Sequence, residues 1–198
     1  MCYQVRTDFS DIDVRNIKEF AITKVEQEFQ PRLNVFPRQL IPVIVPPSRI
    51  LDLYRWGLIP AWAKDIKIGD KLANARAETL IEKPSFRESF LSKRCLVLAS
   101  GFYEWDKKKH QYFIQLKSQK IFAFAGLWNQ WKDEKNSIIK SCTIITCEPN
   151  ESIGKIHNRM PAILNPQEYD KWLNSNTLKE LKSLLIPYKN EIIIRELH

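Results

Sequence analysis

Cys2 is a candidate for covalent chemistry because it follows the initiating methionine. Methionine aminopeptidases generally remove Met1 when the second residue is small, and self-cleavage is another route. The new terminus would be a 1,2-aminothiol whose α-amine, with a pKa of about 7.7–8.0, is partly neutral at physiological pH. This amine can condense with an aldehyde to an imine, and the thiol can then close a thiazolidine ring. The alternative is an inert thiol at a frayed terminus.

Two further segments carry polar residues in patterns that suit a pocket. Polar residues alternate with alanines in residues 74–78, so an extended chain would put Asn74, Arg76 and Glu78 on one face. Glu104 stands among the aromatic residues of Gly101-Phe102-Tyr103-Glu104-Trp105, and burial there would raise its pKa towards the range useful for acid–base catalysis. The alternatives are a solvated strand edge and a surface glutamate on a hairpin.

A loop near residue 157 holds one of only three histidines in the chain. His157 could shuttle protons near neutral pH, and Arg159 could hold a phosphate. A lone histidine is more often structural, so this segment gains meaning only together with the others.

Two tryptophans flank a predicted loop, Trp56-Gly57-Leu58-Ile59-Pro60-Ala61-Trp62. Exposed aromatic rings in this loop could stack on unpaired nucleobases. The alternative is that both are core anchors, and we favour a core position for Trp56.

The chain resembles the SRAP (SOS response-associated peptidase) family of abasic-site processing proteins in several motifs, which occur in the family's order. They are Met1-Cys2, W-G-L-I-P-x-W, N-A-R-A-E-T, R-C-L-V-x-A-x-G-F-Y-E-W and I-H-x-R-M-P, and they run from residue 2 to about 165. The resemblance implies a single α+β domain over residues 1–198. Its curved, mainly antiparallel sheet would form a distorted pseudo-barrel flanked by helices, with a positively charged cleft for single-stranded DNA.

The resemblance also implies a reaction and roles for residues. Cys2 would form a thiazolidine with the aldehyde of an abasic site in single-stranded DNA and so protect the lesion in the DNA damage response. Asn74 would position Cys2 and the sugar, Glu104 would be the general acid/base, and His157 would assist proton transfer. The residues expected to contact DNA are Arg76, Arg159, Trp62, Lys83, Arg87 and Trp105. Abasic-site lyase activity and removal of Met1 by the protein itself are implied as well.

The start of the chain departs from the family pattern Met-Cys-Gly-Arg. Tyr3 and Gln4 stand where the family has Gly and Arg, which puts bulk beside the nucleophile and removes a phosphate contact. Arg6 is a candidate to compensate. Ser100 replaces the Asp of A-D-G-F-Y-E-W, which is a milder change.

Two functions from other classes compete with this one. The first is a non-catalytic single-strand binder in which Cys2 is inert. The second is a cysteine hydrolase built on Cys2, His157 and Asn74, residue types that thiol proteases also use. Only the aldehyde trap needs a free N-terminal amine, and only a covalent adduct survives both high salt and denaturant.

The elements that must position these residues follow from periodicity and turn residues. Strands are predicted at residues 40–45, 50–54, 94–99, 110–116, 120–128, 137–147 and 191–194. Helices are predicted over 13–29, 85–91 and 178–185, and another starts at a capping-box-like 165–168. The strands come in consecutive runs, which favours an α+β, largely antiparallel architecture over a Rossmann-type fold.

Composition sets the remaining expectations. The 198 residues include 31 Lys and Arg against 23 Asp and Glu, a net charge of +8 that favours a polyanionic partner. No segment combines a basic face with a strong apolar one, so we expect nucleic acid and no membrane. Neither a signal peptide nor a spanning segment is recognisable, which predicts a cytosolic protein. A monomer is expected separately. Cys95 and Cys142 read as buried strand residues, and no motif for a metal or nucleotide cofactor is present.

Overall fold

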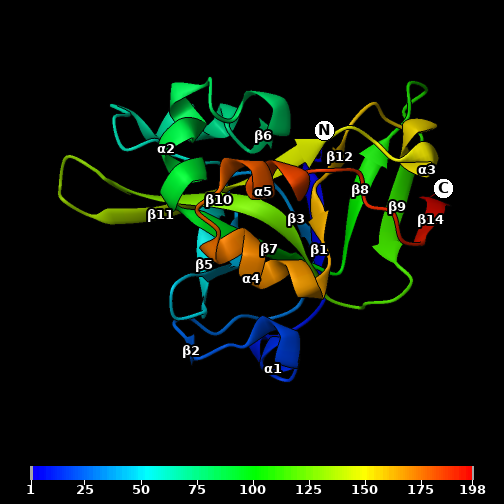
Figure 1. The fold of residues 1–198 in the computed structure, drawn as a ribbon, viewed down its shortest axis with the longest axis horizontal. Coiled ribbons are helices and arrows are strands. Elements are labelled where there is room, and N and C mark those ends of the chain that lie inside the picture. The colour runs from blue at the N-terminus through cyan, green and yellow to red at the C-terminus, as the bar shows by residue number, and fades with distance from the viewer. Residues whose placement is uncertain (1, 198) are drawn as a thin grey trace.

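Five strands close into a barrel at the centre of the computed structural model, which describes residues 2–197 (Figure 1). Around the barrel they are β11 (Ile138–Cys147), β10 (Phe122–Lys132), β7 (Arg94–Ala99), β4 (Leu40–Val45) and β5 (Ile50–Trp56). Neighbours are antiparallel, and a parallel pairing of β11 with β5 closes the ring. All residues of β7 are buried, because the barrel interior covers one face and α4 (Tyr169–Asn174) packs against this strand.

A second, antiparallel sheet has five strands and carries the N-terminus. Its order is β14 (Ile192–Leu197), β9 (Gln111–Leu116), β8 (Gly101–Trp105), β1 (Gln4–Thr7) and β3 (Arg32–Val35). Only Ser100 separates β7 from β8, so one chain segment passes directly from the barrel into the second sheet. The Ser100 hydroxyl donates to the Arg6 carbonyl at 3.1 Å and accepts the Asp8 N–H at 3.3 Å, which ties this crossing to β1.

Short strands and helices complete the fold. β6 (Asn74–Arg76) runs parallel to β11, and β12 (Met160–Pro161) pairs antiparallel with it. β2 (Lys24–Val25) pairs with β5, and β13 (Ile163–Leu164) pairs with β10. The helices are α1 (Asp11–Arg15), α2 (Pro84–Ser92), α3 (Glu151–Gly154), α4 and α5 (Leu178–Ser183), with 3-10 turns η1 (Lys18–Phe20), η2 (Ile66–Lys71), η3 (Ala77–Thr79) and η4 (Pro166–Glu168).

The predicted α+β class with a curved, mainly antiparallel pseudo-barrel is confirmed. Each predicted strand range holds a strand, and the predicted helices near 85–91, after 165–168 and at 178–185 are present. The capping box at Asn165 forms as expected. Cys95 and Cys142 are fully buried in strands, which confirms their predicted places in the core.

The predicted helix over residues 13–29 is wrong. α1 covers only Asp11–Arg15, because a capping box between Ser10 and Asp13 starts the helix earlier than periodicity suggests. Ala21, with a φ of 48°, then turns the chain into the left-handed region, where a helix cannot continue. The apolar residues of this segment still reach the core, but from separate short elements.

Arg94 joins two helices to the barrel. Its side chain is buried at the start of β7, with an exposed fraction of 4% for the residue. The guanidinium donates hydrogen bonds to carbonyl oxygens at the C-terminal ends of α2 and α4, which lack intrahelical partners. These are the carbonyls of Phe90, Leu91, Trp172, Leu173 and Ser175, at 2.6–3.5 Å.

We expect Arg94→Met to lower the free energy of unfolding by roughly 3 kcal/mol, because each buried carbonyl left without a donor costs about 1–3 kcal/mol and water relieves part of the loss. Urea denaturation measures the effect. Arg87→Met, on the exposed side of the same α2, is the matched control and should stay within about 0.5 kcal/mol of wild type. Equal stabilities for the two variants would contradict the assigned role.

Candidate active site

Cys2 is held inside the fold. It is fully buried, and the Asn74 side-chain Nδ2 donates a 2.8 Å hydrogen bond to its carbonyl oxygen. Its Sγ donates to the Gln4 carbonyl at 3.7 Å. Burial raises the pKa of the Cys2 thiol well above its ordinary value, and the negative charge of Glu104 adds to the rise. The interpretation as a frayed terminus is therefore wrong for Cys2, whereas Met1 lies outside the described residues.

Asn74 reaches Cys2 because of how β6 lies on β11. The two strands run parallel, with Asn74 opposite Ile144 and Arg76 opposite Thr146. Ala75 between them is fully buried, so Asn74 and Arg76 share the other face, as alternation predicted. The predicted face ends there, because Glu78 lies beyond the strand in η3.

Glu104 occupies a buried position of β8. The residue is 1% exposed, and Phe102, two residues earlier on the same face, packs edge-on against Phe124 with ring centroids 5.8 Å apart. Burial raises the pKa of Glu104 to about 7. The predicted desolvated carboxyl is thus confirmed, and the alternative of a surface glutamate is excluded. At neutral pH such a group can both give and accept a proton.

His157 lies in the loop between α3 and β12. Its Nδ1 lies 3.0 Å from the Arg159 backbone nitrogen and 3.2 Å from the Arg159 carbonyl oxygen, so the backbone of Arg159 fixes the orientation of the ring. Burial lowers the pKa of His157, which favours the neutral imidazole at physiological pH. α3, which precedes this loop, is capped at its own start by Asn150, whose Oδ1 accepts the N–H of Ile153.

One pocket of about 570 Å³ brings Glu104 and His157 together, whereas Cys2 and Asn74 are not part of its lining. Glu104 from β8 and His157 from the α3–β12 loop line the same walls, although they are far apart in sequence. The full lining is Tyr3, Glu104, Trp105, Asp106, Lys107, Ile156, His157 and Asn158. The pocket therefore holds a carboxyl poised near neutrality and a neutral imidazole, next to the residue that follows Cys2.

A sequence model of the SOS response associated peptidase (SRAP) family matches residues 1–197. The chain belongs to this family. It is 50% identical over 200 residues to the abasic site processing protein YoaM of Bacillus subtilis (strain 168), covering 95% of this chain and 86% of that protein. The abasic site processing protein HMCES of Xenopus tropicalis is 32% identical, over 82% of this chain and 60% of its own length.

A solved structure shares this fold. An X-ray crystal structure of a protein from Bacteroides thetaiotaomicron superposes with a TM-score of 0.92 at 30% identity, covering 100% of this chain and 92% of that one. The architecture described above is therefore the SRAP fold.

Gln4 occupies the position where the family has Arg, and its side chain is held by hydrogen bonds inside the fold. Its Nε2 donates to Asn34 Oδ1 at 2.6 Å, its Oε1 accepts from Gln111 Nε2 at 3.1 Å, and the residue is 8% exposed. Arg6 pairs with Asp8 at 2.8 Å and lines a different pocket. The structure therefore does not support Arg6 as a substitute for the missing arginine.

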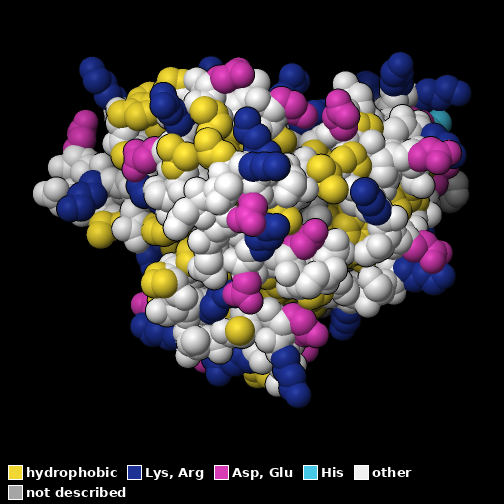
Figure 2. Space-filling view, in the orientation of Figure 1, with side chains coloured by type: hydrophobic (Ala, Val, Ile, Leu, Met, Phe, Trp, Pro, Cys, Tyr) yellow, Lys and Arg dark blue, Asp and Glu magenta, His cyan; other side chains and the backbone are white. Residues whose placement is uncertain are grey.

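The residues predicted to contact DNA fall into two groups. Arg159 makes a bidentate ion pair with Glu78, at 2.8 and 3.0 Å, and donates to the Thr146 carbonyl at 2.6 Å. This geometry makes it a positioning residue for the His157 loop, and its phosphate contact stays a prediction. The others are Arg76, Lys83, Arg87 and Trp62, which are exposed, and Trp105, which is half-buried in the pocket wall. On the face shown in Figure 2, Lys and Arg are scattered among acidic residues.

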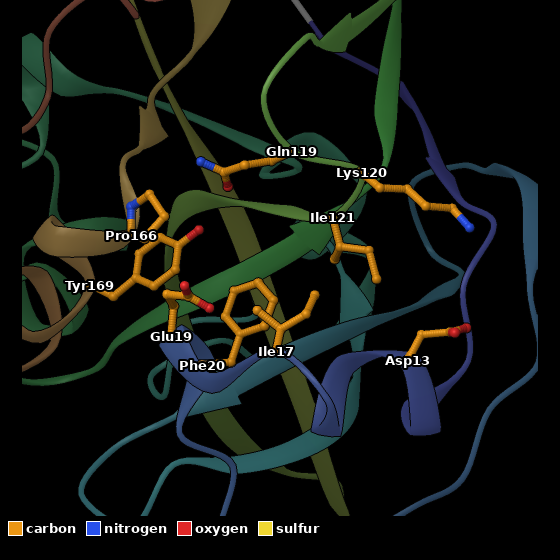
Figure 3. Close-up of a pocket in the computed structure, with 9 residues that line it drawn as sticks. All are labelled: Asp13, Ile17, Glu19, Phe20, Gln119, Lys120, Ile121, Pro166 and Tyr169. Carbon is orange, nitrogen blue, oxygen red and sulfur yellow. The ribbon is translucent and has the colours of Figure 1, made fainter.

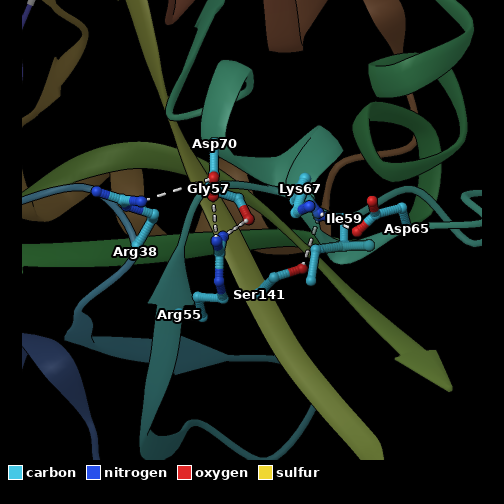
Figure 4. A network of polar contacts seen from close by, with 8 residues as sticks. All are labelled: Arg38, Arg55, Gly57, Ile59, Asp65, Lys67, Asp70 and Ser141. Atoms are coloured by element: carbon cyan, nitrogen blue, oxygen red, sulfur yellow. Dashed lines mark hydrogen bonds and ion pairs between the residues drawn. The ribbon is translucent and has the colours of Figure 1, made fainter. Parts of the chain in front are cut away.

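The two tryptophans of the W-G-L-I-P-x-W motif have different environments. Trp56 is fully buried, and its Nε1 donates to the Ala73 carbonyl at 2.8 Å, which confirms the core position favoured for it. Trp62 is 57% exposed. Between them Gly57 has a φ of 127°, which essentially only glycine adopts. Arg55, paired with Asp70, donates to the Gly57 carbonyl and fixes this turn (Figure 4).

Five residues of the pocket lining are not among the predicted site residues, and two of them, Ile156 and Asn158, lie within the I-H-x-R-M-P motif. Tyr3 was taken only as bulk, and Asp106 and Lys107 of the β8–β9 turn were not considered. Tyr3, Asp106 and Lys107 directly adjoin family motifs in the sequence, and this position could have identified them as pocket residues.

Other features do not join this site. A pocket of about 340 Å³ beside the stacked rings of Phe20 and Tyr169 contains none of the predicted residues (Figure 3). Within residues 2–197 no helix is both long and apolar enough to cross a bilayer. The same residues contain no group of three or more His, Cys, Asp or Glu side chains arranged for a metal ion.

Proposed function

We propose that this protein processes abasic sites by forming a covalent thiazolidine between Cys2, once Met1 is removed, and the lesion's aldehyde in single-stranded DNA. The observation that carries the proposal is the coupling of Cys2 to two groups of the predicted set. Asn74 holds the Cys2 carbonyl, and the charge of Glu104 acts on the thiol. The relatives named abasic site processing proteins, two of which are 46% and 50% identical to this chain, support the same substrate.

The reaction divides into three steps with balanced protons. Glu104 and His157 move protons while the closed deoxyribose opens to its aldehyde. The neutral α-amine of Cys2 then attacks the aldehyde carbon, and loss of one water gives the imine. Finally the sulfur adds to the imine carbon, and the thiol proton passes to the nitrogen. A buried thiol with a raised pKa suits this order, because it stays protonated until the imine forms.

The same groups support two further activities. An imine at the lesion promotes β-elimination, which is a lyase reaction, and removal of Met1 requires proton transfer at the Cys2 amide. We propose that one chain acts alone, since Cys2, Asn74, Glu104 and His157 all come from it.

The raised pKa of the Cys2 thiol is evidence against the cysteine hydrolase. Thiol hydrolases rely on a thiolate favoured by a lowered pKa, whereas burial here favours the neutral thiol. One experiment distinguishes the proposal from a plain single-strand binder. The protein, with a free Cys2 verified by mass, is incubated with single-stranded DNA bearing one abasic site and then denatured. A band of DNA-bound protein on a denaturing gel supports the proposal, and its absence contradicts it.

We expect Glu104→Gln to slow crosslinking by about 100- to 10,000-fold, because a neutral amide keeps the shape but cannot transfer protons. Single-turnover rates at saturating DNA measure this. Glu88→Gln, on α2 and outside the pocket, is the matched control. An unchanged rate for Glu104→Gln would make Glu104 structural.

The same measurement has a pH signature. Glu104 is protonated below a pKa of about 7, so its function as an acid is lost as pH rises through that value. The α-amine has a pKa of about 7.7–8.0, so it becomes protonated and stops acting as a nucleophile as pH falls below that range. The wild-type rate should therefore be bell-shaped, and Glu104→Gln should lose the alkaline fall.

We expect single-stranded DNA to react faster than a blunt, fully paired duplex with the same lesion. The aldehyde must reach a buried residue, and a complementary strand would obstruct the approach. Exposed Trp62 could stack only on unpaired bases. Adduct formation followed over time on both substrates tests this, and equal rates would argue against it.

A further inference from the structure

Tyr3 is an exposed aromatic residue on a fixed backbone. The residue before it is held through the Asn74 hydrogen bond to the Cys2 carbonyl, at 2.8 Å. The residue after it, Gln4, is held by Asn34 and Gln111 at 2.6 and 3.1 Å. Tyr3 itself is nevertheless 45% exposed, in a chain where most large aromatic residues are buried.

The exposed ring lies in the wall of the reaction pocket. Tyr3 lines the same space of about 570 Å³ as Glu104, His157 and Trp105. Two aromatic side chains thus border the place where the lesion would react. Lys107 in the same wall supplies a cation that could accompany a phosphate.

We infer that Tyr3 is a base-stacking residue, whose ring takes the nucleobase adjacent to the abasic site and so helps to select the lesion. This inference rests on the proposed function. A base beside an abasic site has lost one of its stacking neighbours, so an aromatic ring can cover its free face at little cost. Stacking is sequence-tolerant, because every base has a π-face.

The neighbouring Gln4 strengthens the argument. The residue is 8% exposed, and its side chain is engaged with two partners, so it cannot reach a phosphate. Tyr3, which directly precedes β1, is therefore the residue at the edge of the pocket that can meet the DNA, and this contact is aromatic and uncharged. Affinity gained from it should depend little on salt, unlike affinity gained from a phosphate contact.

The test uses single-stranded DNA with a tetrahydrofuran analogue of the abasic site, which cannot react, and 2-aminopurine directly 5′ or 3′ of it. Wild type should quench 2-aminopurine on one side. Tyr3→Gly should lose that quenching and bind roughly 10-fold more weakly, by the same factor at low and high salt. Tyr3→Phe should keep both properties. Phe36→Ala removes a similarly exposed ring, 43%, outside the pocket and is the matched control.

The outcomes separate this inference from the proposed function. Normal crosslinking to a natural abasic site, together with unchanged quenching and affinity in Tyr3→Gly, would overturn only the stacking role. An affinity loss that disappears at high salt would also overturn it, since that would indicate an electrostatic contact. A wild type that forms no adduct would overturn both. Thermal unfolding of each variant checks that the fold is intact.

Discussion

Any residue left ahead of Cys2 should reduce the denaturation-resistant DNA adduct to background, even though the thiol is untouched. In an extended chain the Cys2 nitrogen is part of an amide, and its lone pair is delocalised into the carbonyl. Such a nitrogen cannot form an imine with an aldehyde, so no thiazolidine can close. A thiol hydrolase or a simple DNA binder has no need of this amine.

Two proteins make the comparison: one with a free Cys2, confirmed by intact mass, and one with an uncleavable Gly-Ser extension. Both are incubated with abasic single-stranded DNA and denatured. Binding of each to the unreactive tetrahydrofuran analogue serves as the control, because equal affinities show that the extension does not block the pocket. Comparable adduct yields from the two proteins would refute the aminothiol mechanism, whatever the family membership suggests.

Cys2→Ala should also abolish the stable adduct, but by a different route. The variant keeps an α-amine after Met1 removal, so an imine can form, yet no sulfur is present to close the ring. An open imine hydrolyses on denaturation, whereas borohydride would trap it as a stable amine. Salt-sensitive DNA binding should remain, because Arg and Lys contacts to phosphate are unchanged.

The measurement is the adduct yield with and without reductant. Cys147→Ala, which removes another buried thiol with 2% exposure, is the matched control and should crosslink normally. The missing sulfur at position 2 leaves a small void that should cost about 1 kcal/mol in stability, so both variants should fold. A heat-stable adduct from Cys2→Ala without reductant would show that the proposed linkage is wrong.

Local pattern was sufficient to predict seven of the fourteen strands that the described residues form, namely β4, β5, β7, β9, β10, β11 and β14. β7 and β10 are dense in apolar residues and are bounded by turn residues, and this signal needs no knowledge of partners. The same approach failed at residues 13–29, where apolar residues at helical spacing belong to several short elements. Periodicity cannot distinguish a helix from separate segments that pack on one core, whereas the cap at Ser10 and the left-handed Ala21 decide the matter.

The sequence by itself determined which residues carry chemistry: a thiol at position 2, an amide at Asn74, a carboxyl among aromatics at Glu104 and an imidazole at His157. It also determined that Tyr3 and Gln4 depart from the family pattern. These are local facts about residue type and order, and the family motifs preserve them.

Only the tertiary structure decided how these residues meet. Pairing of β1 with β8 aligns the N-terminus with the strand of Glu104, and pairing of β6 with β11 brings Asn74 to Cys2. The pKa of Glu104 depends on burial within the folded chain, and Arg159 is paired with Glu78 of η3. Such contacts join residues tens of positions apart, and neither hydrophobic periodicity nor turn chemistry carries information on which distant segments will pair.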